Sequence, residues 1–140
     1  MPVTAHVARE FPAGPDAIAA ADDFLGDFGK TNSIPERVLF RARVCVAELM
    51  ANALEHGQAS PDADCFTISA EWNGCSTLDV EFTDTTAPFD PTRHEGVPDS
   101  APYSGSDGGR GLRLMRGLAS GSRYRHDGER NRVGLRFLVQ

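Results

Sequence analysis

The sequence lacks any apolar run of the roughly 18 residues that a membrane-spanning helix requires. Its first residues have neither a basic start nor an apolar core, so no secretory signal peptide is expected. Three cysteines without CxxC spacing predict neither a disulfide framework nor a zinc site. Basic residues number 14 against 20 acidic ones, and the net charge of −6 argues against duplex nucleic acid as a partner. We therefore expect a cytoplasmic protein that contacts neither membrane nor nucleic acid.

The length and composition indicate a single domain over residues 1–140. A chain of 140 residues with a hydrophobic fraction of 40% is long enough to bury a full-sized core. No internal repeat and no linker between domains interrupts the sequence.

The stretch from Ser33 to Gly57 predicts the principal helix of the fold. Ser33 is a candidate N-cap, and Glu36 three residues later completes a capping box. Gly57 is expected to end the helix, and Cys45 is expected to be a small core residue. Apolar residues recur at helical spacing and predict one buried stripe, formed by Leu39, Ala42, Val46, Leu49 and Ala53.

The rest of the chain predicts the order strand, helix, helix, hairpin, loop, helix, hairpin. A first strand at residues 3–8 precedes a helix that is expected to break over residues 29–32. An Asn-Gly pair at 73–74 and an Asp-Gly pair at 127–128 mark the hairpin turns, and a short amphipathic helix is expected at 112–118. Together these elements predict an α+β fold: a two-layer α/β sandwich whose mixed, mostly antiparallel sheet has its helices on one face.

Glu48 and Asn52 lie one helical turn apart, beside the apolar stripe. A carboxylate and an amide in this arrangement can share a water molecule and a hard cation. Such oxygen donors suit Mg²⁺, which keeps several waters and takes its other ligands from phosphates. The alternative interpretation is that both are ordinary solvated helix residues.

Two further features favour a nucleoside triphosphate site. Asp84 directly follows a strand, where it can accept a hydrogen bond from an exocyclic amine such as that of adenine. The long aperiodic loop at residues 91–108, a candidate lid, ends in a glycine cluster at 108–111 that opens a helix and suits phosphate binding. Taken separately, Asp84 is a turn residue or helix cap and the glycines are a flexible loop end. The ordered set with Asn52 favours a site for base, phosphates and metal.

With these motifs the chain resembles the GHKL ATPase superfamily, and within it the anti-sigma-factor serine/threonine kinases. Residues 48–57 are similar to the N box of that family, and residues 84–91 to its adenine-binding G1 box. Residues 109–112, running on to Met115, resemble the G2 box. The likeness extends from the first strand to the last and implies a histidine-kinase-like ATPase domain with the Bergerat fold.

The resemblance implies a role for each matching residue. Glu48 would be the general base that activates a substrate hydroxyl, Asn52 would ligate Mg²⁺, and Asp84 would bind the adenine amine. The other residues implied to bind ATP are His56, Phe89, Gly109, Arg110, Gly111 and Leu112. For His56 a helix C-terminal cap is an equal interpretation.

Thr86 is the one clear departure from the motifs, because the G1 box usually has glycine at this position. That glycine lets the backbone pass close to the base. Two outcomes are open: a shifted turn that tolerates Thr86, or weaker binding of ATP.

The resemblance also implies partners. The substrate would be a STAS-domain anti-anti-sigma factor, whose phosphorylation frees the kinase to sequester a sigma factor, and the kinase would be a homodimer. A second hypothesis is a nucleotide-sensing module that switches partners without phosphorylating them. A third, the catalytic half of a histidine kinase or another GHKL output domain, is disfavoured because we expect no upstream dimerising helix pair with a phosphoacceptor histidine.

Overall fold

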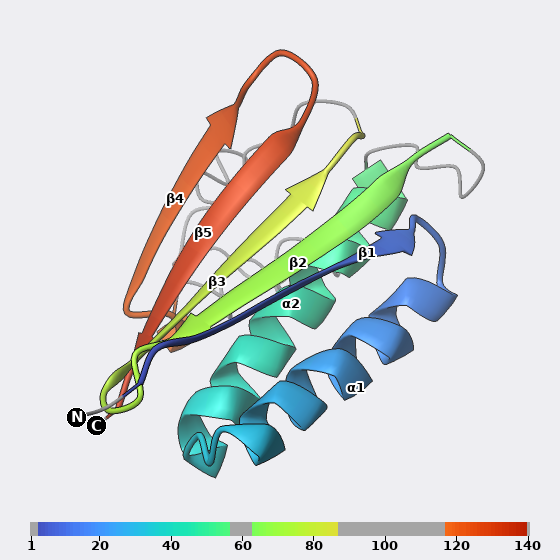
Figure 1. The fold of residues 1–140 in the computed structure, drawn as a ribbon. Helices are drawn as coiled ribbons and strands as arrows, with labels where there is room; N and C mark the ends of the chain where they lie inside the picture. Colours follow the sequence, from blue (N-terminus) through green and yellow to red (C-terminus); the bar gives the residue numbers. More distant parts are fainter. Residues whose placement is uncertain (1–2, 57–62, 87–116, 140) are drawn as a thin grey trace, which may run out of the picture.

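In the computed structural model, the described residues form seven elements of secondary structure (Figure 1). The structure describes residues 3–56, 63–86 and 117–139. The elements are, in order, β1 (Ala5–Pro12), α1 (Asp16–Thr31), α2 (Glu36–His56), β2 (Cys65–Trp72), β3 (Thr77–Asp84), β4 (Gly121–His126) and β5 (Asn131–Leu138). This order agrees with the predicted one. Most of the helix expected at 112–118 lies outside the described residues.

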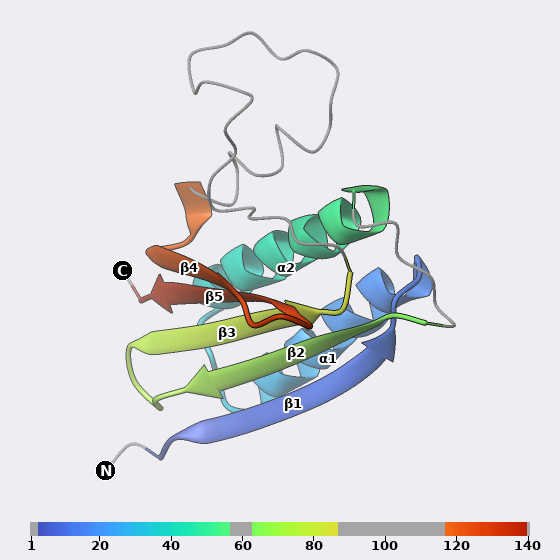
Figure 2. The same ribbon diagram turned by 90° about the horizontal axis from the view of Figure 1, so that it is seen from above.

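The strands form one sheet in the order β1-β2-β3-β5-β4, and every pairing is antiparallel. Both helices cover the same face of this sheet, as Figure 2 shows from above. Helix α1 packs against β1 and β2, whereas α2 packs against β3 and β5. The predicted two-layer α+β sandwich is therefore confirmed, and its sheet is antiparallel throughout the described strands.

The core lies between the sheet and the two helices. All five residues of the predicted stripe on α2 are buried, and Cys45 beside them is fully buried. The sheet contributes the alternating residues of its inner face, and these are Phe66, Ile68, Ala70, Trp72, Leu78, Val80, Phe82, Val133, Leu135 and Phe137. No helix in the described part of the chain combines the length and the apolar character needed to cross a membrane.

The predicted capping box at Ser33 is wrong, because Ser33 belongs to the end of α1. Its φ of 53° is left-handed, and its N–H donates to the Lys30 carbonyl at 3.3 Å. The N–H of Ile34 donates to the Gly29 carbonyl at 2.9 Å. These two bonds form a Schellman motif, which satisfies the last carbonyls of a helix. Helix α2 begins three residues later, at Glu36.

The break predicted over residues 29–32 is confirmed, because α1 ends at Thr31 and has Asn32 as its C-cap. Gly29 itself still lies in the last turn of α1. A Cβ at this position would lie 2.2 Å from Cδ2 of Leu39 on α2. The glycine therefore permits the close approach of the two helices just before α1 ends.

Candidate functional site

Asp84, the last residue of β3, has its carboxylate fixed by three donors. The side chain is 5% exposed, and in the sheet Asp84 lies opposite Asn131 at the start of β5. Its Oδ1 accepts hydrogen bonds from the Thr86 amide at 2.9 Å, from the Thr86 hydroxyl, and from Asn131 Nδ2 at 3.0 Å. Among the described residues, no donor reaches Oδ2. One carboxylate oxygen is thus saturated while the other keeps its capacity to accept.

Asn131 connects Asp84 to β4. Its Nδ2 donates a second hydrogen bond to the Thr86 carbonyl at 3.2 Å, and its Oδ1 accepts one from the Tyr124 hydroxyl at 2.6 Å. Asn131 is 2% exposed, so these bonds form in a buried environment where an unmade bond would be costly. A polar chain therefore runs from Tyr124 through Asn131 to Asp84 and Thr86.

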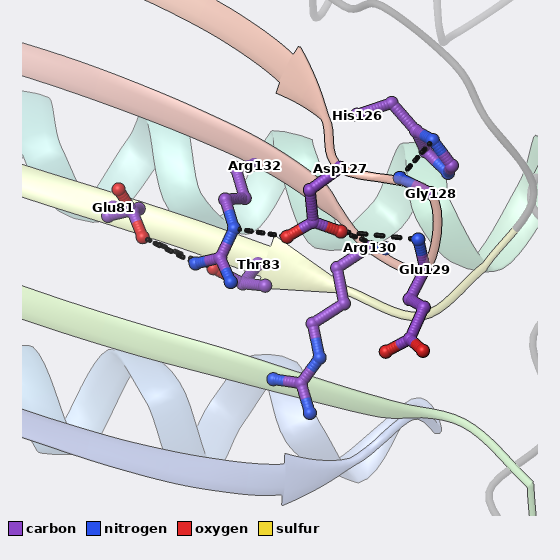
Figure 3. A network of polar contacts seen from close by, with 8 residues as sticks. All are labelled: Glu81, Thr83, His126, Asp127, Gly128, Glu129, Arg130 and Arg132. Carbon is purple, nitrogen blue, oxygen red and sulfur yellow. Dashed lines mark hydrogen bonds and ion pairs between the residues drawn. The ribbon is translucent and has the colours of Figure 1, made fainter.

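Asp127 organises the turn between β4 and β5 (Figure 3). Oδ1 of Asp127 accepts from the backbone N–H groups of Glu129 and Arg130 at 3.2 and 2.9 Å. Its Oδ2 accepts from Nε of Arg132 at 2.8 Å. The Arg132 hydrogen bond, followed by the two backbone ones, holds the pKa of Asp127 well below its usual range. The carboxylate therefore stays charged and caps the turn that leads into Asn131.

On α2, Asn52 is buried but lacks a hydrogen-bond partner. It is 3% exposed, and its Nδ2 has no partner within residues 3–56, 63–86 and 117–139. A buried amide left unpaired costs about 1–3 kcal/mol. Asn52 therefore fits a position where a group from outside this set, such as a ligand or a water, completes its hydrogen bonds.

Glu48 lies one turn before Asn52 and is half-buried. In the part of the chain that the structure describes, its carboxylate makes no hydrogen bond or ion pair. Burial and then the nearby Glu48 charge raise the pKa of the Cys45 thiol to about 12, which keeps that thiol neutral. A half-buried carboxylate without an internal partner is able to accept a proton from an incoming group.

The donor set fits Mg²⁺ held together with phosphates better than a metal held by protein ligands alone. The described residues contain no group of three or more His, Cys, Asp or Glu that could hold a metal. Asn52 offers a single carboxamide oxygen, and Mg²⁺ commonly takes one or two protein ligands, several waters and phosphate oxygens.

The predicted residues that the structure describes come together at one end of the molecule. Glu48, Asn52 and His56 lie on the C-terminal half of α2, and Asp84 ends β3. Figures 1 and 2 both show the C-terminal ends of α2 and β3 at the same end of the fold. The remaining predictions lie outside the described residues, and these are the lid at 91–108 and Phe89, Gly109, Arg110, Gly111 and Leu112.

The sequence reasoning missed Tyr124 and Asn131. Asn131 occupies the inward-facing phase of β5, two residues before the buried Val133. A polar residue at a position where alternation expects an apolar one was the available signal, because such a residue requires buried partners.

Comparison with known proteins shows to which protein family the chain belongs. The profile of the histidine kinase-like ATPase domain matches residues 11–137, nearly the whole chain. The chain therefore belongs to the histidine kinase-like ATPase family, and the resemblance to the GHKL superfamily is confirmed. A search of curated protein sequences finds no match.

Two solved structures share the fold. The RsbU and RsbW domains of Rv1364c from Mycobacterium tuberculosis match with a TM-score of 0.68 and 14% identity, over 96% of this chain and 32% of that one. The histidine kinase domain of the blue-light activated kinase from Erythrobacter litoralis EL346 matches with a TM-score of 0.52 and 15% identity. This match covers 90% of the present chain and 60% of the kinase chain. This chain thus spans less than two thirds of either, and at these identities the likeness concerns the fold alone.

Proposed function

We propose that this protein is an ATP-dependent serine/threonine kinase that phosphorylates a STAS-domain anti-anti-sigma factor and sequesters a sigma factor. It would act in the cytoplasm as a homodimer. Membership of the histidine kinase-like ATPase family supports the nucleotide, and the N, G1 and G2 motifs support the anti-sigma branch. The fold shared with a structure that contains an RsbW domain is compatible with this assignment.

The state of Asp84 is the observation that carries the nucleotide assignment. A buried carboxylate with one saturated oxygen and one open oxygen is an acceptor awaiting a donor. The exocyclic amine of adenine is such a donor, and a hydrogen bond to a charged acceptor is worth about 1.5–3 kcal/mol.

Asn52 and Glu48 supply the metal and base functions of the proposal. Asn52 would hold Mg²⁺, which when bound neutralises the charge of the triphosphate. Glu48, one turn earlier on the same face of α2, would orient a serine or threonine hydroxyl and accept its proton. Gly109, Gly111 and Arg110 would contact the phosphates.

Transfer of labelled phosphate tests the proposal directly. The protein is incubated with γ-labelled ATP, Mg²⁺ and the STAS-domain and sigma-factor proteins encoded near its own gene. We expect label on a serine or threonine of a STAS protein, and less of it at limiting ATP when Asp84→Asn replaces the wild type. ATP binding without transfer to any STAS protein would instead favour the nucleotide-sensing module. Absence of ATP binding by the wild-type protein would overturn the nucleotide assignment itself.

A further inference from the structure

Thr86 replaces the glycine expected in the G1 motif, and its two donors converge on a single atom. Both its amide and its hydroxyl donate to Oδ1 of Asp84, and its side chain is buried at 6% exposure. The threonine is therefore part of the buried network around Asp84. This local turn, in which an acidic side chain accepts from the residue two positions later, is a common way to fix an Asp rotamer.

We propose that Thr86, Asn131 and Tyr124 are positioning residues that make Asp84 a one-sided acceptor and so set the preference for a 6-amino purine over a 6-oxo purine. None of the three need touch the nucleotide. The inference rests on the proposed nucleotide site and adds to it the residues that determine its selectivity.

The hydrogen-bond count explains why the acceptor is one-sided. An ionised carboxylate offers about four lone-pair sites, two on each oxygen. Three donors already converge on Oδ1 of Asp84, from Thr86 and Asn131. Rotating the carboxylate would break these bonds in a buried environment. The network therefore keeps Oδ2 as the oxygen available to a ligand.

Asn131 is in turn held in one orientation. Its Nδ2 faces two acceptors, Oδ1 of Asp84 at 3.0 Å and the carbonyl of Thr86 at 3.2 Å. A flipped amide would direct its oxygen at both of these oxygens and would lose the Tyr124 hydroxyl at 2.6 Å. Tyr124 thus acts on Asp84 through Asn131, at two hydrogen bonds' distance.

A fixed acceptor discriminates between purines at the 6 position. A 6-amino group donates to Oδ2, whereas a 6-oxo group would bring oxygen against a carboxylate oxygen in a partly desolvated site. Sites built around one buried hydrogen bond reject analogues that cannot make it, often strongly. If Asp84 were free to turn, a water or a shifted pose would relieve part of that repulsion, and the selectivity would fall.

Calorimetric titration of ATP and GTP tests the inference. Thr86→Val removes the hydroxyl at constant shape, and Thr86→Ser is the matched control because it keeps the hydroxyl. We expect Thr86→Val to lose about tenfold in ATP affinity, as for one hydrogen bond to a charged group, with a smaller loss for GTP. Thr86→Ser should bind as the wild type does. Tyr124→Phe should lower the ratio of ATP to GTP affinity in the same direction but by less.

A double-mutant cycle separates positioning from a general structural role. In the Asp84→Asn background, Thr86→Val should cause no further loss of ATP affinity, because the acceptor it positions is gone. An equal loss in both backgrounds, or an unchanged ratio of ATP to GTP affinity in both Thr86→Val and Tyr124→Phe, would overturn the inference while the proposed function stands. If Thr86→Val fails to fold, Tyr124→Phe alone decides. A wild-type protein that binds no ATP would overturn the proposed function and the inference together.

Discussion

Two buried asparagines of nearly equal exposure behave in opposite ways. Asn131 is 2% exposed, and its amide forms hydrogen bonds with Asp84, Thr86 and Tyr124. Asn52 is 3% exposed, and its Nδ2 has no partner among the described residues. The first amide is satisfied by the fold itself. The second is satisfied only if something outside the described residues binds it.

This contrast divides the site into two parts with different tasks. The part around Asn131 is internally complete, so it stabilises the end of β3 and orients Asp84 whether or not a nucleotide is bound. The part around Asn52 and Glu48 on α2 is incomplete, which is expected of groups that act on a ligand.

The largest expected effect is on the incomplete side, at Glu48. Glu48→Gln keeps the size of the side chain but removes the proton acceptor, so phosphoryl transfer to a STAS protein should fall by about 10²–10⁴-fold. Binding of Mg²⁺-ATP should persist, because the base does not contact the adenine.

Single-turnover transfer with labelled ATP measures this rate, and Glu71→Gln on the exposed side of β2 is the matched control. Transfer at the full rate in Glu48→Gln would show that the base assignment is wrong.

Replacing each asparagine by alanine tests whether the two amides contribute differently to the free energy of unfolding. Asn131→Ala removes the hydrogen bonds to the Tyr124 hydroxyl and to two buried acceptors, so it should lower the free energy of unfolding by about 2–4 kcal/mol. Asn52→Ala removes an amide that the described fold leaves unpaired, so without nucleotide the change should stay below about 1 kcal/mol.

Urea unfolding with and without Mg²⁺-ATP measures both variants. At ATP concentrations of about 100 times Kd the wild type should gain about 2.7 kcal/mol, and Asn52→Ala should gain less. If Asn52→Ala destabilised the free protein as much as Asn131→Ala does, Asn52 would have an internal partner and its ligand role would be lost.

Asp84 belongs to the internally complete part, but its free oxygen is proposed to bind the nucleotide. Asp84→Asn should weaken binding of Mg²⁺-ATP by about 1–3 kcal/mol, because a charged acceptor for the base amine becomes a neutral one. Asp79→Asn is the control on the same strand, since Asp79 pairs with Arg136 on the outer face of the sheet at 2.8 Å. Equal affinities of Asp84→Asn and wild type, measured by calorimetry, would exclude Asp84 from base recognition.

The smallest expected effect concerns an ion pair away from the site. Nε and Nη2 of Arg43 on α2 donate to Asp22 on α1 at 2.8 and 2.5 Å, and the hydrogen bond from Arg43 lowers the pKa of Asp22. Both side chains are more than a third exposed, so the pair should contribute less than about 1 kcal/mol.

The sign of its pH dependence follows from that lowered pKa. The stabilisation is complete above the ordinary carboxyl pKa of 3.8 and is lost as the pH falls through the lower pKa of the folded state. The free energies of unfolding of the wild type and Asp22→Asn should therefore differ slightly at neutral pH and become equal in strong acid. Asp23→Asn is the exposed control. A difference that grew on acidification would contradict the pairing.

Local sequence patterns predicted the helices and strands well, because the periodicity of a helix or strand is set by residues close together in the chain. The five-residue stripe of α2 and the alternation of β2, β3 and β5 are set by periods of 3.6 and 2, and all of the predicted positions on α2 are buried. Local pattern also identified two polar site residues. Asn52 borders the apolar stripe of α2, and Asp84 directly follows the alternation of β3.

The error at Ser33 arose because one residue type suits two opposite helix ends. Ser33 has the residue type of an N-cap, yet bonds to Lys30 and from Ile34 to Gly29 place it in the C-terminal motif of α1. The break over residues 29–32 was predicted correctly, but not the close approach of Gly29 to Leu39 on the next helix. That contact depends on how the two helices pack, which residue types alone do not give.

By itself, the sequence determined the order of the elements, the face that each one buries, and the residue types that a nucleotide site requires. Only the tertiary structure decided how those residues are used. It joined Tyr124 and Asn131 to Asp84 and Thr86, more than 35 residues away in the chain, and the hydrogen bond between Asn131 and Asp84 spans 47 residues. It left Asn52 buried without a partner in the described residues. The physical reason is that periodicity selects which side of a helix or strand is buried, whereas the partner of a buried polar group is selected by the packing of elements from distant parts of the chain.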